Sequence, residues 1–251
     1  MAKFVVNLSW NDAPHLSEQA KKEMLAGCSP HERDARSKGI PQLGSGAIYP
    51  VCEDDIVEES FVIPDTWPRA CGMDVGWKKT AAIWGAYDKK SDTWHLYSEY
   101  YRGYAEPSIH ANAIAARGKW VPILIDCHST AHSQAGAEAL IVTYDRLGLN
   151  LIKADNGSGT LEPGILDMYQ RLSSGRMKVM RHLVNWLAEF RVYRRDMNGK
   201  IAGNQDDHLM DATRFLEKSG TQVMELPPPD DMDDIPKETT YRRKGNDVTG
   251  Y

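Results

Sequence analysis

Cysteine is scarce in this sequence. Only four cysteines occur among 251 residues, and they are scattered without a C-x-x-C pair. This disfavours a disulfide framework and a zinc finger, and it suggests a reducing compartment. Long apolar runs are lacking too, since no stretch reaches the roughly 18 residues that a membrane helix needs. The opening MAKFVVNLSW has one lysine and no long apolar core, so we expect no secretory signal and no membrane partner.

An excess of positive charge is also missing. The chain carries 30 Lys and Arg against 35 Asp and Glu, a formal net charge of -5. Binding of nucleic acid over the whole surface is therefore disfavoured, although a local basic patch stays possible. Hydrophobic residues make up 41% and charged residues 26%, which is ordinary for a soluble globular protein. The length suits one domain with appendages.

Three regions differ in composition. Residues 1–67 predict a helical lead-in, with short helices opening at Ser17 and Pro30 that have too few large apolar residues to form a core of their own. Residues 68–219 hold the apolar runs and should form the folded core. Residues 220–251 begin close to a triple proline and are rich in acids, which predicts a tail without a fixed fold.

The core region mixes short strands with helices. The expected strands cover residues 69–75, 80–87, 93–101, 121–126, 149–153 and 177–180, and the expected helices cover 107–117, 134–147, 162–173, 183–191 and 205–217. Brief polar connections join the first three strands, which indicates an antiparallel meander. Later strands alternate with helices, which indicates parallel crossovers. We therefore predict an α/β fold with a mixed sheet and helices on both faces.

Four aspartates stand where these elements end or turn. Asp74 closes the first strand, Asp126 closes a continuously apolar strand, and Asp207 and Asp211 lie four residues apart on the last helix. If the two strands are neighbours, their acids reach the same sheet edge. Converging carboxylates repel one another unless a cation lies between them, and Mg²⁺ or Mn²⁺ prefers such oxygen ligands. A pair of these ions is a common device for hydrolysing phosphodiesters.

Structural explanations stay open for each acid. Asp126 could be a turn residue or a helix cap, and Asp207 with Asp211 could form a solvated helix face. We expect His208 and Asp206 to contact the ligands rather than to bind the metal themselves.

Three segments resemble a known family. MDVGWKKTAAIW, ILIDCHST and NQDDHLMDATRF are similar to the three acidic motifs of the nuclease domain in large terminase subunits of tailed bacteriophages. The lead-in, with SWNDAPHL and ERDARSKGIPQLGSGAIYPV, resembles the segment that joins the packaging ATPase of a terminase to its nuclease. The resemblance covers about residues 7–217. It implies a ribonuclease H-like fold and a metal-dependent endonuclease that cuts concatemeric viral DNA at the start and end of genome packaging.

The resemblance also implies roles, partners and a place. Asp74 and Asp126 would be metal ligands and catalytic residues, and so would Asp207, Asp211 or both. The chain has no G-x-x-x-x-G-K-[ST] motif, so the ATPase half would be missing and residues 1–67 would be a linker from it. The implied partners are double-stranded DNA and, through the full-length protein, the portal and the small terminase subunit. The implied location is the cytoplasm of the infected bacterial host.

Basic residues cluster in one stretch. Residues 176–200 hold seven Lys and Arg against two acids. A nuclease needs phosphate contacts. We therefore predict DNA contacts at Arg191, Arg194, Arg195 and Lys200, with Lys78 and Lys79 as a second candidate group. The alternative is a solvated helix face with structural ion pairs.

Other functions remain to be distinguished. A junction resolvase would share the fold, and a non-catalytic packaging module could use it for docking alone. D-V-G-W-K-K-T also resembles the first phosphate loop of sugar kinases and actin-like ATPases, but those need a second lobe. The acidic tail could contact a partner or only aid solubility, and we expect its removal from residue 221 onward to leave cleavage intact.

Overall fold

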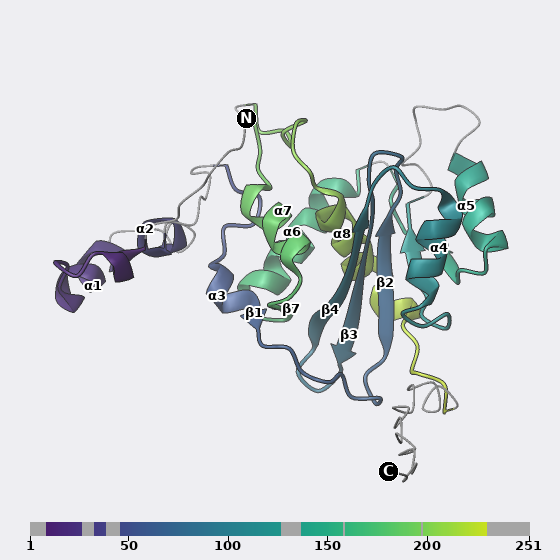
Figure 1. Cartoon of the computed structure of the whole chain (residues 1–251), viewed down its shortest axis with the longest axis horizontal. Helices are drawn as coiled ribbons and strands as arrows, with labels where there is room; N and C mark the ends of the chain where they lie inside the picture. The colour runs from purple at the N-terminus through teal and green to yellow at the C-terminus, as the bar shows by residue number, and fades with distance from the viewer. Residues whose placement is uncertain are drawn as a thin grey trace, which may run out of the picture.

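A seven-stranded mixed sheet forms the centre of the molecule. The computed structural model describes residues 9–26, 33–38, 46–126, 137–157, 159–196 and 198–229, and within them the strand order is β1-β7-β4-β3-β2-β5-β6. The strands are β1 Val57–Glu58, β2 Arg69–Asp74, β3 Thr80–Asp88, β4 Thr93–Arg102, β5 Ile123–Ile125, β6 Leu151–Lys153 and β7 Met177–Met180. Figure 1 shows the sheet with helices on either side.

The three central strands form the expected meander. β2 pairs with β3 and β3 with β4, both antiparallel, because turns of only a few residues join them. The outer strands β5 and β6 on one side, and β7 and β1 on the other, are all parallel to their neighbours. The predicted combination of antiparallel and parallel strands is confirmed.

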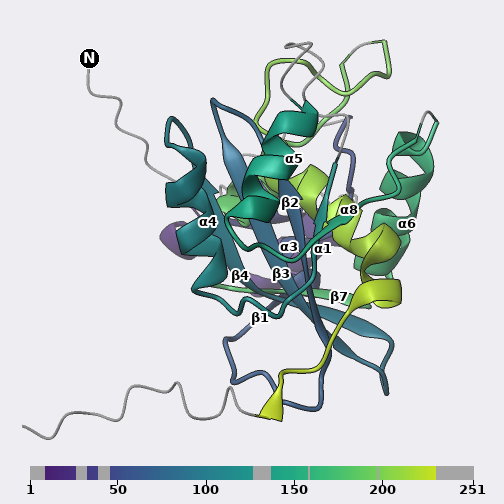
Figure 2. The same ribbon diagram turned by 90° about the vertical axis from the view of Figure 1, so that its right-hand side faces the viewer.

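Helices cover both faces of the sheet, as predicted. They are α3 Glu53–Ile56, α4 Pro107–Ala115, α5 Ala137–Arg146, α6 Leu161–Ser173, α7 Val184–Val192 and α8 His208–Val223. Figure 1 shows α6 and α7 on one side of the sheet and α4 and α5 on the other, and Figure 2 turns α4 and α5 toward the viewer. Alternate residues of β2 follow this division, since Ala70 belongs to the core under α6, α7 and α8, whereas Cys71 and Met73 belong to the core under α4 and α5.

Helix α8 lies unusually close to the sheet. A Cβ placed on Gly72 of β2 would come within 1.8 Å of the carbonyl oxygen of Ala212 in α8. Only glycine therefore allows this approach. The contact brings the first turn of α8 close to the end of β2, where Asp74 lies.

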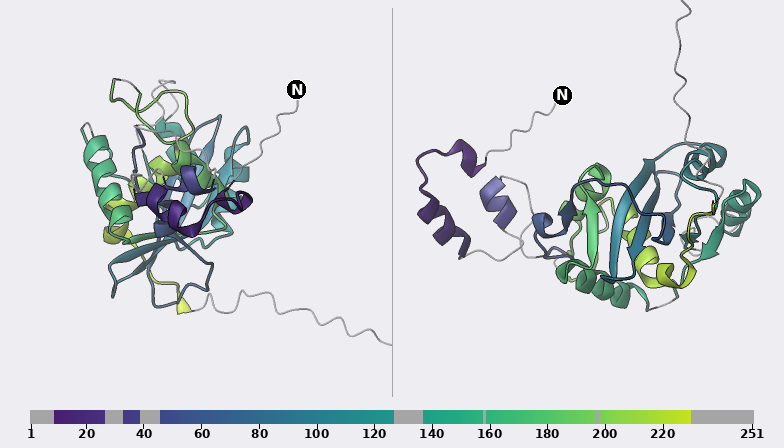
Figure 3. Two further views of the ribbon diagram at one scale, coloured as in Figure 1. Left: turned by 90° about the vertical axis from the view of Figure 1, so that its left-hand side faces the viewer. Right: turned by 90° about the horizontal axis from the view of Figure 1, so that it is seen from below.

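The lead-in divides into two parts. The 3-10 helix η1 (Trp10–Asp12), α1 (Glu18–Ala26) and α2 (Arg33–Lys38) stand away from the sheet (Figure 3), and α1 buries no residue. Residues 46–67, by contrast, belong to the folded domain. Ile48, Tyr49 and Ile56 are buried in the main core, and β1 pairs with β7. The domain therefore starts before residue 68, the boundary that we predicted, because β1 is too short to be recognised without its partner strand.

The domain also ends later than predicted. Helix α8 continues to Val223, and Arg69 and Glu225 then exchange backbone hydrogen bonds of 2.7 and 3.1 Å. A deletion from residue 221 would remove these contacts, so a truncation should start after residue 229. Residues 230–251, most of the expected acidic tail, lie outside the described residues.

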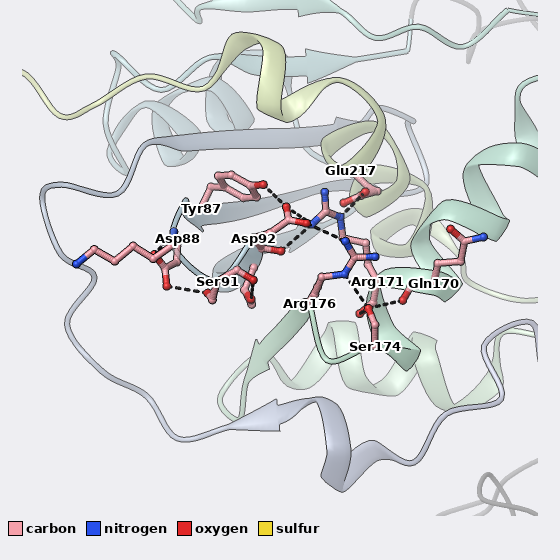
Figure 4. Close-up of polar contacts among 11 residues, drawn as sticks. Tyr87, Asp88, Ser91, Asp92, Gln170, Arg171, Ser174, Arg176 and Glu217 are labelled. Carbon is pink, nitrogen blue, oxygen red and sulfur yellow. Dashed lines mark hydrogen bonds and ion pairs between the residues drawn. The ribbon is translucent and has the colours of Figure 1, made fainter.

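A polar network ties the β3–β4 turn to two helices, as Figure 4 shows. Arg171 of α6 donates to the carbonyl oxygen and the carboxylate of Asp92, each at 2.8 Å, and to Glu217 of α8 at 2.7 Å. Arg176 also donates to Asp92, at 2.8 Å, and the hydroxyl of Tyr87 bonds to the same carboxylate. One guanidinium thus joins the meander, α6 and α8.

We expect Arg171→Ala to lower the free energy of unfolding by about 3 kcal/mol, because it leaves the largely buried Glu217 carboxylate without its cation. Urea unfolding would measure this loss. Arg181→Ala is the control, since its ion pair with Glu59 is exposed and worth only about 0–1 kcal/mol. Equal losses in the two variants would contradict a structural role for the network.

Candidate active site

Two aspartates meet at one edge of the sheet. Asp74 ends β2, and Asp126 directly follows β5. The two strands are parallel neighbours with Met73 opposite Ile125, so Asp74 and Asp126 occupy the next positions in the same register. Met73 and Ile125 are fully buried and fix the strand ends, while both aspartates stay partly accessible. The ends of β2 and β5 are therefore neighbours, as predicted.

The last helix begins later than predicted. Helix α8 starts at His208, so Asp206 and Asp207 precede it and Asp207 takes the N-cap position. The side chain of Gln205 explains the delay, because it pairs with the backbone N–H and carbonyl of Arg194 at 3.0 and 3.1 Å. Asp211 still lies one turn beyond Asp207, since its N–H donates to the Asp207 carbonyl at 2.9 Å.

Cationic side chains engage two of the acids. Nδ1 of His208 lies 2.7 Å from Oδ2 of Asp74, and this hydrogen bond raises the pKa of His208. Arg214 of α8 is almost fully buried and binds Asp211 at 2.9 Å. The same guanidinium donates to Oδ1 of Asn156 at 3.0 Å, so the Gly-rich loop after β6 is joined to the site.

The carboxylates influence one another electrostatically. Burial, followed by the nearby charge of Asp211, raises the pKa of Asp207 to about 6. Burial also raises the pKa of Asp211, and the charges of Asp74 and Asp126 act in the same direction while Arg214 opposes them. The charges of Asp74 and Asp126 therefore reach Asp211, and that of Asp211 reaches Asp207, so the four acids selected from the sequence are linked through Asp211.

The four aspartates offer the type of ligand atom that a hard divalent cation prefers. Their carboxylate oxygens repel one another, and a bound cation would relieve this repulsion. The ligand geometry is not preformed. Within the part of the chain that the structure describes, no group of three His, Cys, Asp or Glu side chains is placed to hold a metal ion. His208 and Arg214 instead turn toward Asp74 and Asp211. Binding a metal would thus require these side chains to readjust.

Glu189 of α7 is a residue that the sequence analysis did not select. It is buried, and its Oε2 accepts hydrogen bonds from the N–H groups of Leu209 and Met210 at 2.6 and 3.3 Å. It therefore satisfies the free donors in the first turn of α8. Burial raises the pKa of Glu189 to about 7. The sequence did contain one indication of its role, since Glu189 is the single acid in the mainly apolar segment VNWLAEFRV.

The predicted DNA-contacting cations fall into two groups. Arg191 donates to Glu53 at 2.6 and 2.5 Å, and Arg195 donates to Glu162 at 2.8 and 2.6 Å. For these two, the structural ion pairs that we considered as the alternative are present. Lys79 lies 4.0 Å from the centre of the Tyr101 ring. The remaining three cations are exposed to solvent, namely Arg194, Lys200 and Lys78.

Comparison with known proteins places this arrangement in a family. The family described as the terminase RNaseH-like domain matches residues 71–216, a span that includes all four acids. The large terminase subunit of Enterobacteria phage LP7 is 31% identical over 219 residues, covering 84% of this chain and 45% of that protein. The large terminase subunit of Salmonella phage P22 is also 31% identical over 219 residues, covering 84% and 43%. The chain thus spans less than half the length of these relatives.

Solved structures agree on the fold. The nuclease domain of the P22 large terminase superposes with a TM-score of 0.67 and 26% identity, covering 73% of this chain and 96% of that one. The large terminase of a thermophilic bacteriophage gives a TM-score of 0.57 and 17% identity, covering 84% of this chain and 53% of that one, a likeness of fold. The predicted ribonuclease H-like fold is confirmed, and the chain belongs to the terminase RNaseH-like domain family.

Proposed function

We propose that this chain is the nuclease part of a large terminase subunit, a metal-dependent endonuclease that cuts concatemeric viral DNA when genome packaging starts and ends. The observation that carries this proposal is the convergence of Asp74, Asp126, Asp207 and Asp211 at one sheet edge, with raised pKa values at the last two. The likeness to the P22 nuclease domain supports it.

Mg²⁺ or Mn²⁺, as a pair of ions, is the proposed cofactor. When bound between the carboxylates, it would make a water molecule more nucleophilic and stabilise the charge on the leaving oxygen. Hydrolysis then breaks the bond from phosphorus to the 3′ oxygen and adds the elements of water. Asp74 and Asp126 would hold the cofactor from the sheet, and Asp207 and Asp211 from the helix.

Neighbouring side chains orient the proposed ligands. His208 fixes the carboxylate of Asp74 through its 2.7 Å hydrogen bond, and Arg214 fixes that of Asp211. Glu189 anchors the helix end that carries Asp207. Together these contacts hold the acids of the helix and of the sheet at the same edge.

The proposal also covers the substrate, the protein partners and the location, which are DNA, other packaging proteins and the host cytoplasm. The exposed Arg194, Lys200 and Lys78 are available for phosphate contacts, since among the described residues no ion pair engages them in the way that Glu53 and Glu162 engage Arg191 and Arg195. Nothing in the sequence suggests reading of base edges, so we expect little dependence on DNA sequence. The portal and the small terminase subunit would meet the full-length protein in the cytoplasm of the infected bacterium.

A plasmid assay tests the proposal. Supercoiled plasmid incubated with the 251-residue chain should be nicked and linearised with Mg²⁺ or Mn²⁺ and stay intact in EDTA. Cleavage that persists in EDTA would exclude a metal-dependent site. A chain that binds DNA and these metals without cutting would instead support a docking module.

A further inference from the structure

Two large aromatic side chains are exposed side by side near the acidic edge. Trp77 lies in the turn between β2 and β3, and Tyr104 follows β4. Trp77 is 63% exposed and Tyr104 is 70% exposed, and their ring centres are 6.4 Å apart with the rings at 85°. Aromatic residues in such an arrangement contribute nothing to the core, and paired exposure is typical of a contact surface.

The backbone holds this pair in a defined position. The N–H of Tyr104 donates to the carbonyl of Trp77 at 3.0 Å. A Cβ on Gly103 would come within 2.0 Å of the carbonyl oxygen of Lys78, so the two turns touch through backbone alone. Tyr104 itself has a φ of 52°, a conformation that glycine would adopt at lower cost. An exposed tyrosine in such a backbone conformation points to a role for its ring outside the core.

The pair is close to the proposed site, and two exposed cations lie in the same two turns. Trp77 is three residues beyond Asp74, in the turn that directly follows β2. Lys78 and Arg102 are exposed beside the two rings, and Glu106 is the single acid in the two turns 75–79 and 102–106. Cations bind phosphates, and aromatic rings stack on bases or sugars regardless of sequence.

We propose that Trp77 and Tyr104, with Lys78 and Arg102, form a DNA contact that positions the scissile strand on the acidic edge. The cations bind phosphates next to the cut, and the rings pack against the neighbouring base or deoxyribose. This inference rests on the proposed nuclease function and adds positioning residues to it. It also explains how the site binds DNA where Arg191 and Arg195 are already paired with carboxylates.

DNA binding in EDTA tests the contact apart from cleavage. Fluorescence anisotropy of a labelled duplex should show Trp77→Ala binding about tenfold more weakly than the wild type, the loss expected for one stacking contact. Trp77→Phe should recover most of the affinity. Phe61→Ala is the matched control, because Phe61 is an aromatic residue with 41% exposure whose ring contacts His95, at the opposite end of the sheet from Asp74.

Tyr104→Gly distinguishes a role of the Tyr104 ring in DNA binding from a role in stabilising the fold. Glycine suits the positive φ, so this variant should keep or raise the melting temperature while it weakens DNA binding. In cleavage assays both Trp77→Ala and Tyr104→Gly should raise KM more than they lower kcat. Binding by these variants within twofold of the wild type, or an equal loss in Phe61→Ala, would overturn the inference. A wild type that binds DNA through Trp77 yet never cuts would refute the proposed nuclease and leave the contact surface standing.

Discussion

Asp74→Asn is expected to lower the rate of plasmid cleavage by roughly 10³-fold, because it removes a charged ligand of the cofactor. The metal contributes several kcal/mol of transition-state stabilisation, and about 4 kcal/mol corresponds to three orders of magnitude. Asparagine keeps the size of the side chain and can still hydrogen-bond to His208, 2.7 Å from the present carboxylate. The variant should therefore fold, and the loss would report on charge. Initial rates of supercoiled plasmid loss with Mn²⁺ would measure it.

Comparison variants make this result specific. His208→Gln should lose less activity, about 10- to 100-fold, because His208 orients the metal ligand Asp74 and is not itself a ligand. Glu59→Gln changes an exposed carboxylate of a surface ion pair and should cut like the wild type. Mn²⁺ at about 100 times its Kd should stabilise the wild type by about 2.7 kcal/mol, and Asp74→Asn by much less. Undiminished cleavage or an undiminished Mn²⁺ effect in Asp74→Asn would refute the assignment of Asp74.

The metal-free chain is expected to be less stable at pH 8 than at pH 5. Burial raises the pKa of Glu189 from 4.5 to about 7, so the fold prefers its neutral form. Its contribution to the free energy of unfolding is complete below pH 4.5 and is lost as the pH rises through 7, a change of about 3 kcal/mol. Four other groups also have raised pKa values and act in the same direction, namely Asp207, His208, Asp211 and Glu217. Urea unfolding in EDTA between pH 5 and pH 8 would show the decline.

Glu189→Gln isolates the share of this one residue. The amide oxygen can still accept from the N–H groups of Leu209 and Met210, and the hydroxyl of Tyr101 and the ring of His208 remain as the other polar neighbours. The variant should therefore lose at most about a third of the decline, because Glu217 and Asp207 have shifts of similar size, and it should be at least as stable as the wild type at pH 8. If its stability runs parallel to that of the wild type across this range, Glu189 is not the titrating group.

Strand positions were predictable because they depend on local patterns. The expected strands 69–75, 80–87 and 93–101 differ from β2, β3 and β4 by a single residue each, at the end. Alternating or continuous apolar residues between polar turns determine such strands without help from the rest of the chain. The placement of Asp74 and Asp126 at strand ends followed directly from the same patterns.

The predicted ends of helices were wrong where contacts with distant parts of the chain determine them. The start of α8 is delayed by the pairing of Gln205 with Arg194, and the helix continues through Gly220 because this glycine packs against the ring of Trp94. Glu189 escaped notice for the same reason. Glu189 caps a helix that begins nearly 20 residues later in the sequence, and no local sequence pattern indicates such a contact.

The sequence by itself determined an α/β fold, two apolar strands that each end in an aspartate, and an amphipathic last helix with acids at its start. The tertiary structure alone decided which charges are already paired. Arg191 is bound to Glu53, 138 residues away, and Arg195 to Glu162, whereas Lys78 and Arg102 stay exposed beside two aromatic rings. Hydrophobic periodicity is a local property of the chain, but a charge is neutralised by whichever partner folding brings within about 4 Å, and that depends on the whole topology.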